Sequence, residues 1–260
     1  MADPKTVQKG SELLRLHRDP SLLTVVNVWD AVSAKVVAAV EGTHALATAS
    51  HSIAASYGYE DGENIPLDLM LEAVKRVVDA TDLPATADLE GGYGNAAETV
   101  RRAIGIGVVG ANIEDQMKPL PEAVAQVEAI MKVADEEGVD FVLNARTDAF
   151  HLGRDKDPAE NLATAIERGK AYLEAGAPVV FVPARLTDEQ VQELVEAFGP
   201  QRLSVIHIPG LPPLARLEEL GVARVSYGPA PQRISLAALQ DLAAMLYSGG
   251  VLPDGIRPLN

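Results

Sequence analysis

Cysteine is absent from this chain of 260 residues, which excludes disulfides, thiolate metal sites and catalysis by a cysteine. Long hydrophobic runs are absent as well. No stretch approaches about 18 uncharged apolar residues, so the sequence predicts no membrane span. The first residues, 1–5, lack the basic and then apolar pattern of a signal peptide, and we therefore expect a cytoplasmic protein.

Basic residues are few: 22 Lys and Arg stand against 37 Asp and Glu, and the formal net charge is −15. This excess of negative charge argues against nucleic acid or an anionic membrane surface as a partner. Its simplest effect is to keep the protein in solution. An acidic chain can still bind an acidic small molecule, but only where an Arg, a Lys or a metal ion is placed locally.

Short apolar runs alternate with longer amphipathic segments along the chain. The runs are rich in Val, Ala and Ile without polar alternation, which is typical of parallel strands buried on both faces. We predict strands over residues 24–28, 44–49, 83–88, 108–113, 139–145, 178–182, 203–206 and 223–226. We predict helices over residues 31–41, 67–80, 96–104, 121–137, 158–175, 188–198, 211–220 and 236–247.

Eight strands, each followed by a helix, predict an α/β fold of the (β/α)₈ TIM-barrel type, formed as a single domain over residues 1–260. Leu13 and Leu16, at helical spacing behind Ser11 as a cap, predict an extra helix before the first strand. The alternative is a doubly wound open sheet. Residues 27–31 lack the glycine-rich turn that a dinucleotide-binding sheet carries after its first strand.

Acidic residues follow three of the predicted strands. Asp88 and Glu90 end one strand, Glu114 and Asp115 end the next, and Asp61 follows an earlier strand across a short loop. Active sites of such barrels lie at the carboxyl ends of the strands. Several carboxylates gathered there suit a hard cation such as Mg²⁺. Any one of them can alternatively be a helix cap or part of a surface ion pair.

Further polar residues follow other strands. Arg146 can form a bidentate pair with a substrate carboxylate, or it can simply neutralise the acidic cluster. His51 and His207 are weaker signals, because each histidine can be part of a loop and make no contact with a substrate. The candidate substrate-binding residues are Trp29, Asp30, Ser50, His51, Arg146 and His207, and the candidate catalytic residues are Asp61, Glu114, Arg146 and His51.

Five segments in register resemble motifs of the isocitrate lyase and phosphoenolpyruvate mutase superfamily. Segment 88–94, Asp-Leu-Glu-Gly-Gly-Tyr-Gly, is similar to its Asp-x-Asp-x-Gly-Tyr-Gly, and segment 145–149 matches its Ala-Arg-Thr-Asp-Ala. The other resembling segments are 29–34, 54–62 and 113–116. The order and spacing of the motifs hold from about residue 20 to residue 230.

The resemblance implies a barrel that binds a 2-oxo acid through Mg²⁺, with Mn²⁺ as a substitute, and makes or breaks a C–C or P–C bond next to a pyruvate enolate. It implies that Asp88 is the direct metal ligand. Asp61, Glu90 and Glu114 would then hold the water molecules of the metal. The same resemblance implies a homo-oligomer, a dimer or a tetramer, in which the last helix is exchanged between subunits or packs on its own barrel.

The substrate side of the site follows from the same resemblance. Arg146 would clamp the substrate carboxylate, helped by Ser50 and His51 through a side chain or a backbone N–H. Trp29 and Asp30 would border the pocket for the oxo acid. The expected partner is therefore a small 2-oxo acid or dicarboxylate.

The chain also departs from the family pattern. The lyases carry a Lys-Lys-x-Cys-Gly-His loop after the Glu-Asp-Gln element, whereas residues 117–121 lead at once into the next helix. Ordinary isocitrate or methylisocitrate lyase activity is therefore not expected. Pro183 stands where the lyases often have Glu and the mutase has His. Because the chain has no Cys, the candidate proton donors are His51, His207, Tyr57 and a metal-bound water.

Three hypotheses follow. The first is a Mg²⁺-dependent lyase that cleaves a C–C bond in a small 2-oxo or 2-hydroxy acid through a stabilised enolate. The second is P–C chemistry on phosphoenolpyruvate or phosphonopyruvate, for which Lys118 is one of few basic groups near the short loop. The third is a barrel that binds a 2-oxo acid without turnover.

Overall fold

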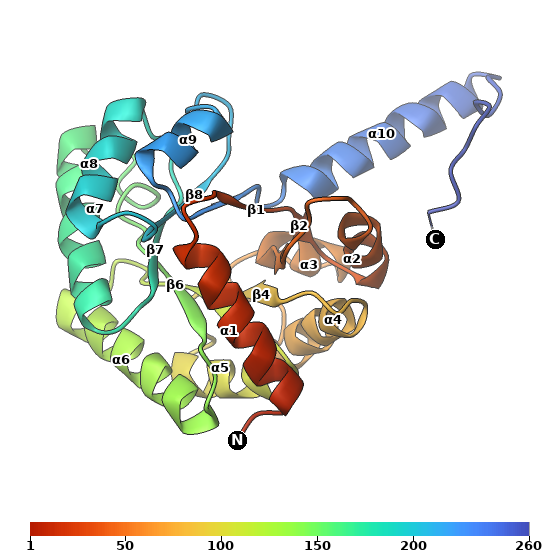
Figure 1. Ribbon diagram of the computed structural model, residues 1–260. Helices are drawn as coiled ribbons and strands as arrows, with labels where there is room; N and C mark the ends of the chain where they lie inside the picture. Colours follow the sequence, from red (N-terminus) through yellow and green to blue (C-terminus); the bar gives the residue numbers. More distant parts are fainter. Residues whose placement is uncertain (260) are drawn as a thin grey trace.

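In the computed structural model, which describes residues 1–259, nine parallel strands form a nearly closed barrel that helices surround (Figure 1). The strand order is β1-β9-β8-β7-β6-β5-β4-β3-β2. β1 (Leu23–Val25) pairs with β9 and β2 (Asn27–Val28) pairs with β3, although only Val26 separates them. One extended segment thus joins both edges of the sheet, and the predicted (β/α)₈ barrel is confirmed.

The remaining elements alternate along the chain. The other strands are β3 (Leu46–Thr48), β4 (Ala85–Asp88), β5 (Gly110–Glu114), β6 (Val142–Arg146), β7 (Val179–Val182), β8 (Leu203–Ile206) and β9 (Arg224–Ser226). The helices are α1 (Pro4–Arg18), α2 (Ala31–Ala38), α3 (Ser50–Ser56), α4 (Leu67–Asp79), α5 (Ala96–Gly105), α6 (Leu120–Glu137), α7 (Pro158–Glu174), α8 (Asp188–Phe198), α9 (Leu214–Leu220) and α10 (Ala230–Tyr247). No helix within residues 1–259 is long and apolar enough to cross a membrane.

The register of the parallel strands decides which side chains meet inside the barrel. Asp88 is opposite Asn112, Asn112 is opposite Asn144, and Glu114 is opposite Arg146. Partners in a parallel ladder face the same side of the sheet. The acidic ends of β4 and β5 therefore lie next to the basic end of β6.

The predicted extra helix is present as α1, but it begins at Pro4 behind the cap Asp3, so the expectation that Ser11 caps it was wrong. Asp3 accepts a hydrogen bond from the Lys5 amide and leaves Ser11 inside the helix. Leu13 of this helix is fully buried and lies against Gly110 at the start of β5. A Cβ on Gly110, the first residue of β5, would lie 2.9 Å from Leu13 Cδ2, so this glycine allows α1 to approach closely.

Other helices also differ from the prediction, among them α2, which ends at Ala38 instead of residue 41. α3, Ser50–Ser56, follows β3 directly where a loop was expected, because its small residues give almost no amphipathic pattern. α9 begins only at Leu214, since Pro213 occupies the cap position before it. α10 begins at Ala230, with Pro231 in its first turn, where a missing N–H costs nothing. The predicted single domain over 1–260 stays a prediction, and residue 260 lies outside the described residues.

Candidate active site

A pocket of about 530 Å³ opens at the carboxyl ends of the strands. It brings together most of the predicted site residues, which are Ser50, His51, Asp61, Asp88, Glu90, Glu114 and Arg146. Trp29 and Asp30 line a neighbouring groove beside Pro231 instead. The His207 ring lies outside the pocket lining, with its centre 5.9 Å from that of Tyr227. The substrate contacts of Trp29, Asp30 and His207 stay predictions.

Asp88 lies at the end of β4 with Ser50 directly beside it. The Ser50 amide and hydroxyl donate to Asp88 Oδ2 at 3.3 and 3.1 Å, and the same hydroxyl lies 3.1 Å from Asp61 Oδ1. Burial raises the pKa of the Asp88 carboxyl, while Arg146 and the bonds from Ser50 oppose the shift. A cation beside Asp88 would therefore lower the free energy needed to keep its buried carboxylate ionised.

Glu90 is buried and its backbone is held in the left-handed region, with φ at 54°. The Glu63 amide donates to one carboxylate oxygen, and the Tyr93 hydroxyl donates to the other at 3.2 Å. Burial raises the pKa of Glu90 to about 7, with the nearby Asp61 and Asp88 adding to the shift. Strained backbone is concentrated at functional sites, where the surrounding structure enforces it.

Arg146 holds two carboxylates at once. Its guanidinium lies 2.8 Å from Glu114 Oε2 and 2.7 Å from Asp148 Oδ1. Burial raises the pKa of Glu114 to about 7, because the attraction of Arg146 only partly offsets desolvation and the repulsion of Asp148 and Asp88. The two ion pairs agree with a role of Arg146 in neutralising the acidic cluster. They also hold its guanidinium in one orientation, in which it would form a bidentate pair with a substrate carboxylate.

The carboxylates of this pocket outnumber its basic side chains. Their ligand atoms are all oxygens, which hard divalent cations prefer. In the described part of the chain, no three carboxylate or imidazole groups already converge on one point. Ser50, Glu63 and Arg146 instead hold the oxygens of Asp88, Glu90 and Glu114. This arrangement fits one direct ligand with the other carboxylates acting through water.

The raised pKa values predict how stability depends on pH. In metal-free protein, the folded state keeps protons on Glu90 and Glu114 that the unfolded chain releases near its ordinary pKa of 4.5. This contribution, about 2 kcal/mol after allowance for solvent, is complete below pH 4.5 and lost as the pH rises through 7. Added Mg²⁺ should therefore raise the melting temperature strongly at pH 8 and little at pH 5.

Thermal melts of EDTA-treated protein across this range, with and without Mg²⁺, test the prediction. The double variant Glu90→Gln, Glu114→Gln is the control, because its carboxyl groups no longer titrate. Equal stabilisation by Mg²⁺ at pH 5 and pH 8 would contradict it.

Asp115, which the sequence groups with the strand-end carboxylates, lies outside the pocket lining and instead anchors the short loop after β5. Its Oδ2 accepts from Arg168 Nε and from the Tyr172 hydroxyl, each at 2.6 Å. Its Oδ1 accepts from the amides of Met117 and Asp148 at 2.9 and 3.0 Å. Burial opposes ionisation of Asp115, but these bonds outweigh it and lower its pKa. No local pattern indicated this cluster, because Arg168 and Tyr172 lie on α7, far along the chain.

We expect Asp115→Asn to destabilise the fold by about 2 kcal/mol, because the buried Arg168 loses its charged partner. The exposed pair of Asp188 and Arg216 provides the control, and Asp188→Asn should cost less than about 1 kcal/mol. Urea unfolding of both variants measures the difference. An equal loss of unfolding free energy in the two variants would show that Asp115 stabilises the fold no more than a surface ion pair does.

The loop that replaces the lyase loop is tightly formed. Gln116 and Met117 both have positive φ, at 48° and 53°, and α6 begins at Leu120. A Cβ on Gly91 would lie 2.4 Å from Gln116 Nε2, so only glycine lets these two loops touch. The segment therefore connects β5 to α6 as a short turn.

Other pocket residues escaped the sequence prediction. Phe181, Ile206 and Ile208 form an apolar wall at the carboxyl ends of β7 and β8, together with Pro183, which the family resemblance had already singled out. Hydrophobic residues at strand ends have the same sequence pattern as the barrel core, so nothing marked Phe181, Ile206 and Ile208 as ligand contacts. His151 also lines the pocket, and its position shortly after Asp148 was the only available signal.

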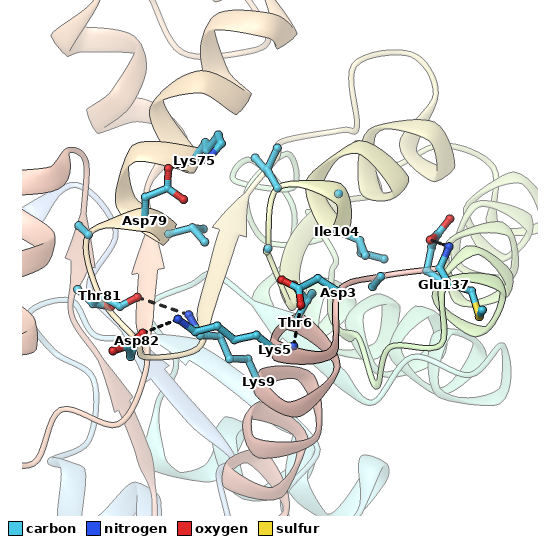
Figure 2. A pocket seen from close by; sticks show the side chains of 17 residues that line it. Asp3, Lys5, Thr6, Lys9, Lys75, Asp79, Thr81, Asp82, Ile104 and Glu137 are labelled. Atoms are coloured by element: carbon cyan, nitrogen blue, oxygen red, sulfur yellow. Dashed lines mark hydrogen bonds and ion pairs between the residues drawn. The ribbon is translucent and has the colours of Figure 1, made fainter.

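A larger hollow of about 740 Å³ lies at the opposite, amino-terminal end of the barrel, beside α1 (Figure 2). Its charged groups are already paired across it. Lys5 donates to Asp82 at 2.5 Å and Lys9 to the Thr81 carbonyl at 3.4 Å. The amino terminus likewise contacts Glu137 at 3.0 Å. Most of the charged groups that line this hollow are paired with one another.

Known proteins support the resemblance drawn from the motifs. A family model described as phosphoenolpyruvate phosphomutase matches residues 13–247. The 2,3-dimethylmalate lyase of Eubacterium barkeri is 29% identical over 91% of this chain and 84% of its own. A crystal structure from Burkholderia cenocepacia J2315, provisionally named a phosphonomutase, is 40% identical over 94% of this chain and 100% of its own, with a TM-score of 0.84.

A third relative is an oxaloacetate acetylhydrolase crystallised with its product oxalate. It is 26% identical with a TM-score of 0.84, and the match covers 96% of this chain and 91% of that one. These relatives carry different names for their reactions but share the barrel. The chain belongs to the phosphoenolpyruvate phosphomutase family, within the isocitrate lyase and phosphoenolpyruvate mutase superfamily of lyases and mutases.

Proposed function

We propose that this protein is a Mg²⁺-dependent lyase that cleaves a C–C bond in a small 2-oxo or 2-hydroxy acid. The observation that carries the proposal is the division of the pocket into two halves. One half gathers Asp88, Glu114 and Arg146, and the other is an apolar wall that includes Phe181 and Ile206. A substrate with an acidic end and an alkyl end would match both halves.

Each residue of the acidic half has a part in this reaction. Asp88 would hold Mg²⁺ directly, with Asp61, Glu90 and Glu114 on its water molecules. The ion would supply Lewis-acid stabilisation of the developing enolate charge. Arg146 would bind and orient the substrate carboxylate and add positive charge at the same place.

We assign the proton step to His51, which lines the pocket. Its Nε2 lies 3.1 Å from Arg233 Nη2, and its buried Nδ1 has no protein partner in the described residues. A guanidinium can only donate, so Nε2 accepts and Nδ1 carries the proton. His51 would thus offer an N–H donor toward a bound acid.

Phosphonate chemistry is less well supported by the same pocket. A phosphonate needs several cationic partners. Within the described residues, Arg146 is the one Lys or Arg in the pocket lining, and Lys118 Nζ lies 3.4 Å from Gln126 on α6, outside that lining. The relative named for 2,3-dimethylmalate, a substituted 2-hydroxy acid, agrees better with an apolar wall.

A thermal-shift screen tests the proposal, with pyruvate, oxaloacetate, 2-oxoglutarate, oxalate, 2,3-dimethylmalate and phosphonopyruvate, each with and without Mg²⁺. Stabilisation that needs both an acid and Mg²⁺ is expected, followed by C–C cleavage detected by proton NMR. A new phosphorus NMR signal from phosphonopyruvate would favour P–C chemistry instead. Stabilisation without any product would favour a binding protein that has no turnover.

We also propose that the protein assembles as a dimer or tetramer through α10. This helix projects from the barrel, with the carboxyl terminus beyond it (Figure 1). Its Ile234, Leu236, Leu239 and Tyr247 are at least half exposed, an arrangement that favours burial against a second copy. Light scattering should give a multiple of 27.5 kDa, and Leu236→Glu, Leu239→Glu should reduce the mass. A monomeric parent protein would contradict this.

A further inference from the structure

Arg224 is a buried charge without an ionic partner in the centre of the barrel. It begins β9, opposite Ser204 and Leu23, and is only 1% exposed. No carboxylate within residues 1–259 forms an ion pair with it. Among the described residues, its one hydrogen-bond contact is Asn112 Oδ1, 3.4 Å from Nη1, and its Nε has no partner. Isolated charges are costly to bury, so the site must compensate for Arg224 in another way.

The groups around Arg224 are polar but uncharged. Asn112 Oδ1 also accepts from Asn144 Nδ2 at 2.7 Å, while Asn144 Oδ1 and the Ser204 hydroxyl have no partner in the part of the chain that the structure describes. From the α1 side comes His17, whose pKa burial and Arg224 lower to about 3, so it is neutral. None of these groups supplies the missing negative charge.

The acidic cluster lies directly above this arginine. Asn112 is opposite Asp88 in the parallel ladder, about 4.8 Å away, and both line the pocket. Asn112 thus contacts the Arg224 guanidinium through its side chain and is the strand neighbour of Asp88. Burial lowers the pKa of Arg224 to about 10 while Asp88 opposes the shift, so the group stays charged at neutral pH.

We propose that Arg224 is a buried counter-charge beneath the carboxylate cluster, which weakens cation binding there and strengthens binding of an anionic acid on top of the cation. Arg224 acts through its field and touches no substrate. The proposal rests on the proposed function for the presence of a cation and an acid in the pocket. It would allow the site to release metal readily yet hold a charged substrate once metal is bound.

The test measures two affinities in the full-length protein at pH 7.5. Mn²⁺ binding is followed by electron paramagnetic resonance of the free ion, and oxalate binding by calorimetry in saturating Mn²⁺. For Arg224→Gln, which keeps polar atoms beside Asn112 and Asn144, we expect Mn²⁺ to bind about tenfold more tightly. Oxalate should bind about tenfold more weakly, because a nearby positive charge is gone.

Arg224→Lys is the matched control and should keep both affinities within about threefold of the parent. Arg224→Met is a second neutral variant with an apolar side chain of similar length, and it should give the same two changes in affinity as Arg224→Gln. It replaces Arg224→Gln in the test if that variant does not fold. Opposite changes in the two affinities support the counter-charge. A parallel loss of both in the neutral variants, or no change in either, would overturn it, because a structural role loosens the whole site.

The two proposals fail in different ways. If the parent binds Mn²⁺ and oxalate but cleaves no acid, the proposed lyase function fails while the counter-charge is still decided by the variants. If the parent binds no Mn²⁺ at all, the metal-dependent function and the counter-charge are overturned together.

Discussion

Asp88→Ala is expected to abolish metal-dependent turnover, with a loss of about a thousandfold or more in kcat/KM. Asp88 ends β4 in the acidic half, and the Ser50 hydroxyl lies 3.1 Å from both Asp88 Oδ2 and Asp61 Oδ1. Without this carboxylate the cation would lose its direct ligand, and the remaining acids would hold only its waters. Steady-state kinetics on the acid identified by the thermal screen measure the loss.

The effect must be separated from unfolding. Removing Asp88 also removes a buried charge, so the variant should melt at least as high as the metal-free parent and should no longer respond to Mg²⁺. Asp68→Asn is the matched control, because Asp68 is an exposed acid that contacts only Arg102 in a surface pair. Unchanged turnover in Asp88→Ala would refute the metal-dependent lyase.

Replacing Arg146 is expected to have the second largest effect. Arg146→Ala should weaken binding of the acid substrate by at least about a hundredfold, since no other side chain in the pocket offers a fixed bidentate fork. Arg146→Lys keeps the charge but not the fork, and should recover the pairing with Glu114 without recovering most of the affinity. Calorimetry with oxalate and Mg²⁺ measures each variant, and Arg102→Ala is the surface control.

This pair of variants also decides between the two roles that the sequence left open. If Arg146 only neutralises Glu114 and Asp148, lysine should serve as well as arginine and affinity for the acid should be kept. If it clamps the substrate, the lysine variant should remain stable but bind the acid poorly.

The predicted strands of the barrel and most of its helices were confirmed because their signals are local. Buried parallel strands are short runs of Val, Ala and Ile, and a helix such as α4 or α5 has an apolar face at regular spacing. α3 was missed because Ser and Ala give little such signal, and the start of α1 was misplaced because Asp3, not Ser11, caps it.

The sequence by itself determined the barrel, the strand ends that carry Asp88, Glu114 and Arg146, and the shortness of the loop after Gln116. These features depend on residues close together along the chain. Only the tertiary structure decided what surrounds them. Distant segments supply the Arg168 anchor, the apolar wall and the unpaired Arg224, and their partners are set by barrel closure and strand register, which no local pattern of residues encodes.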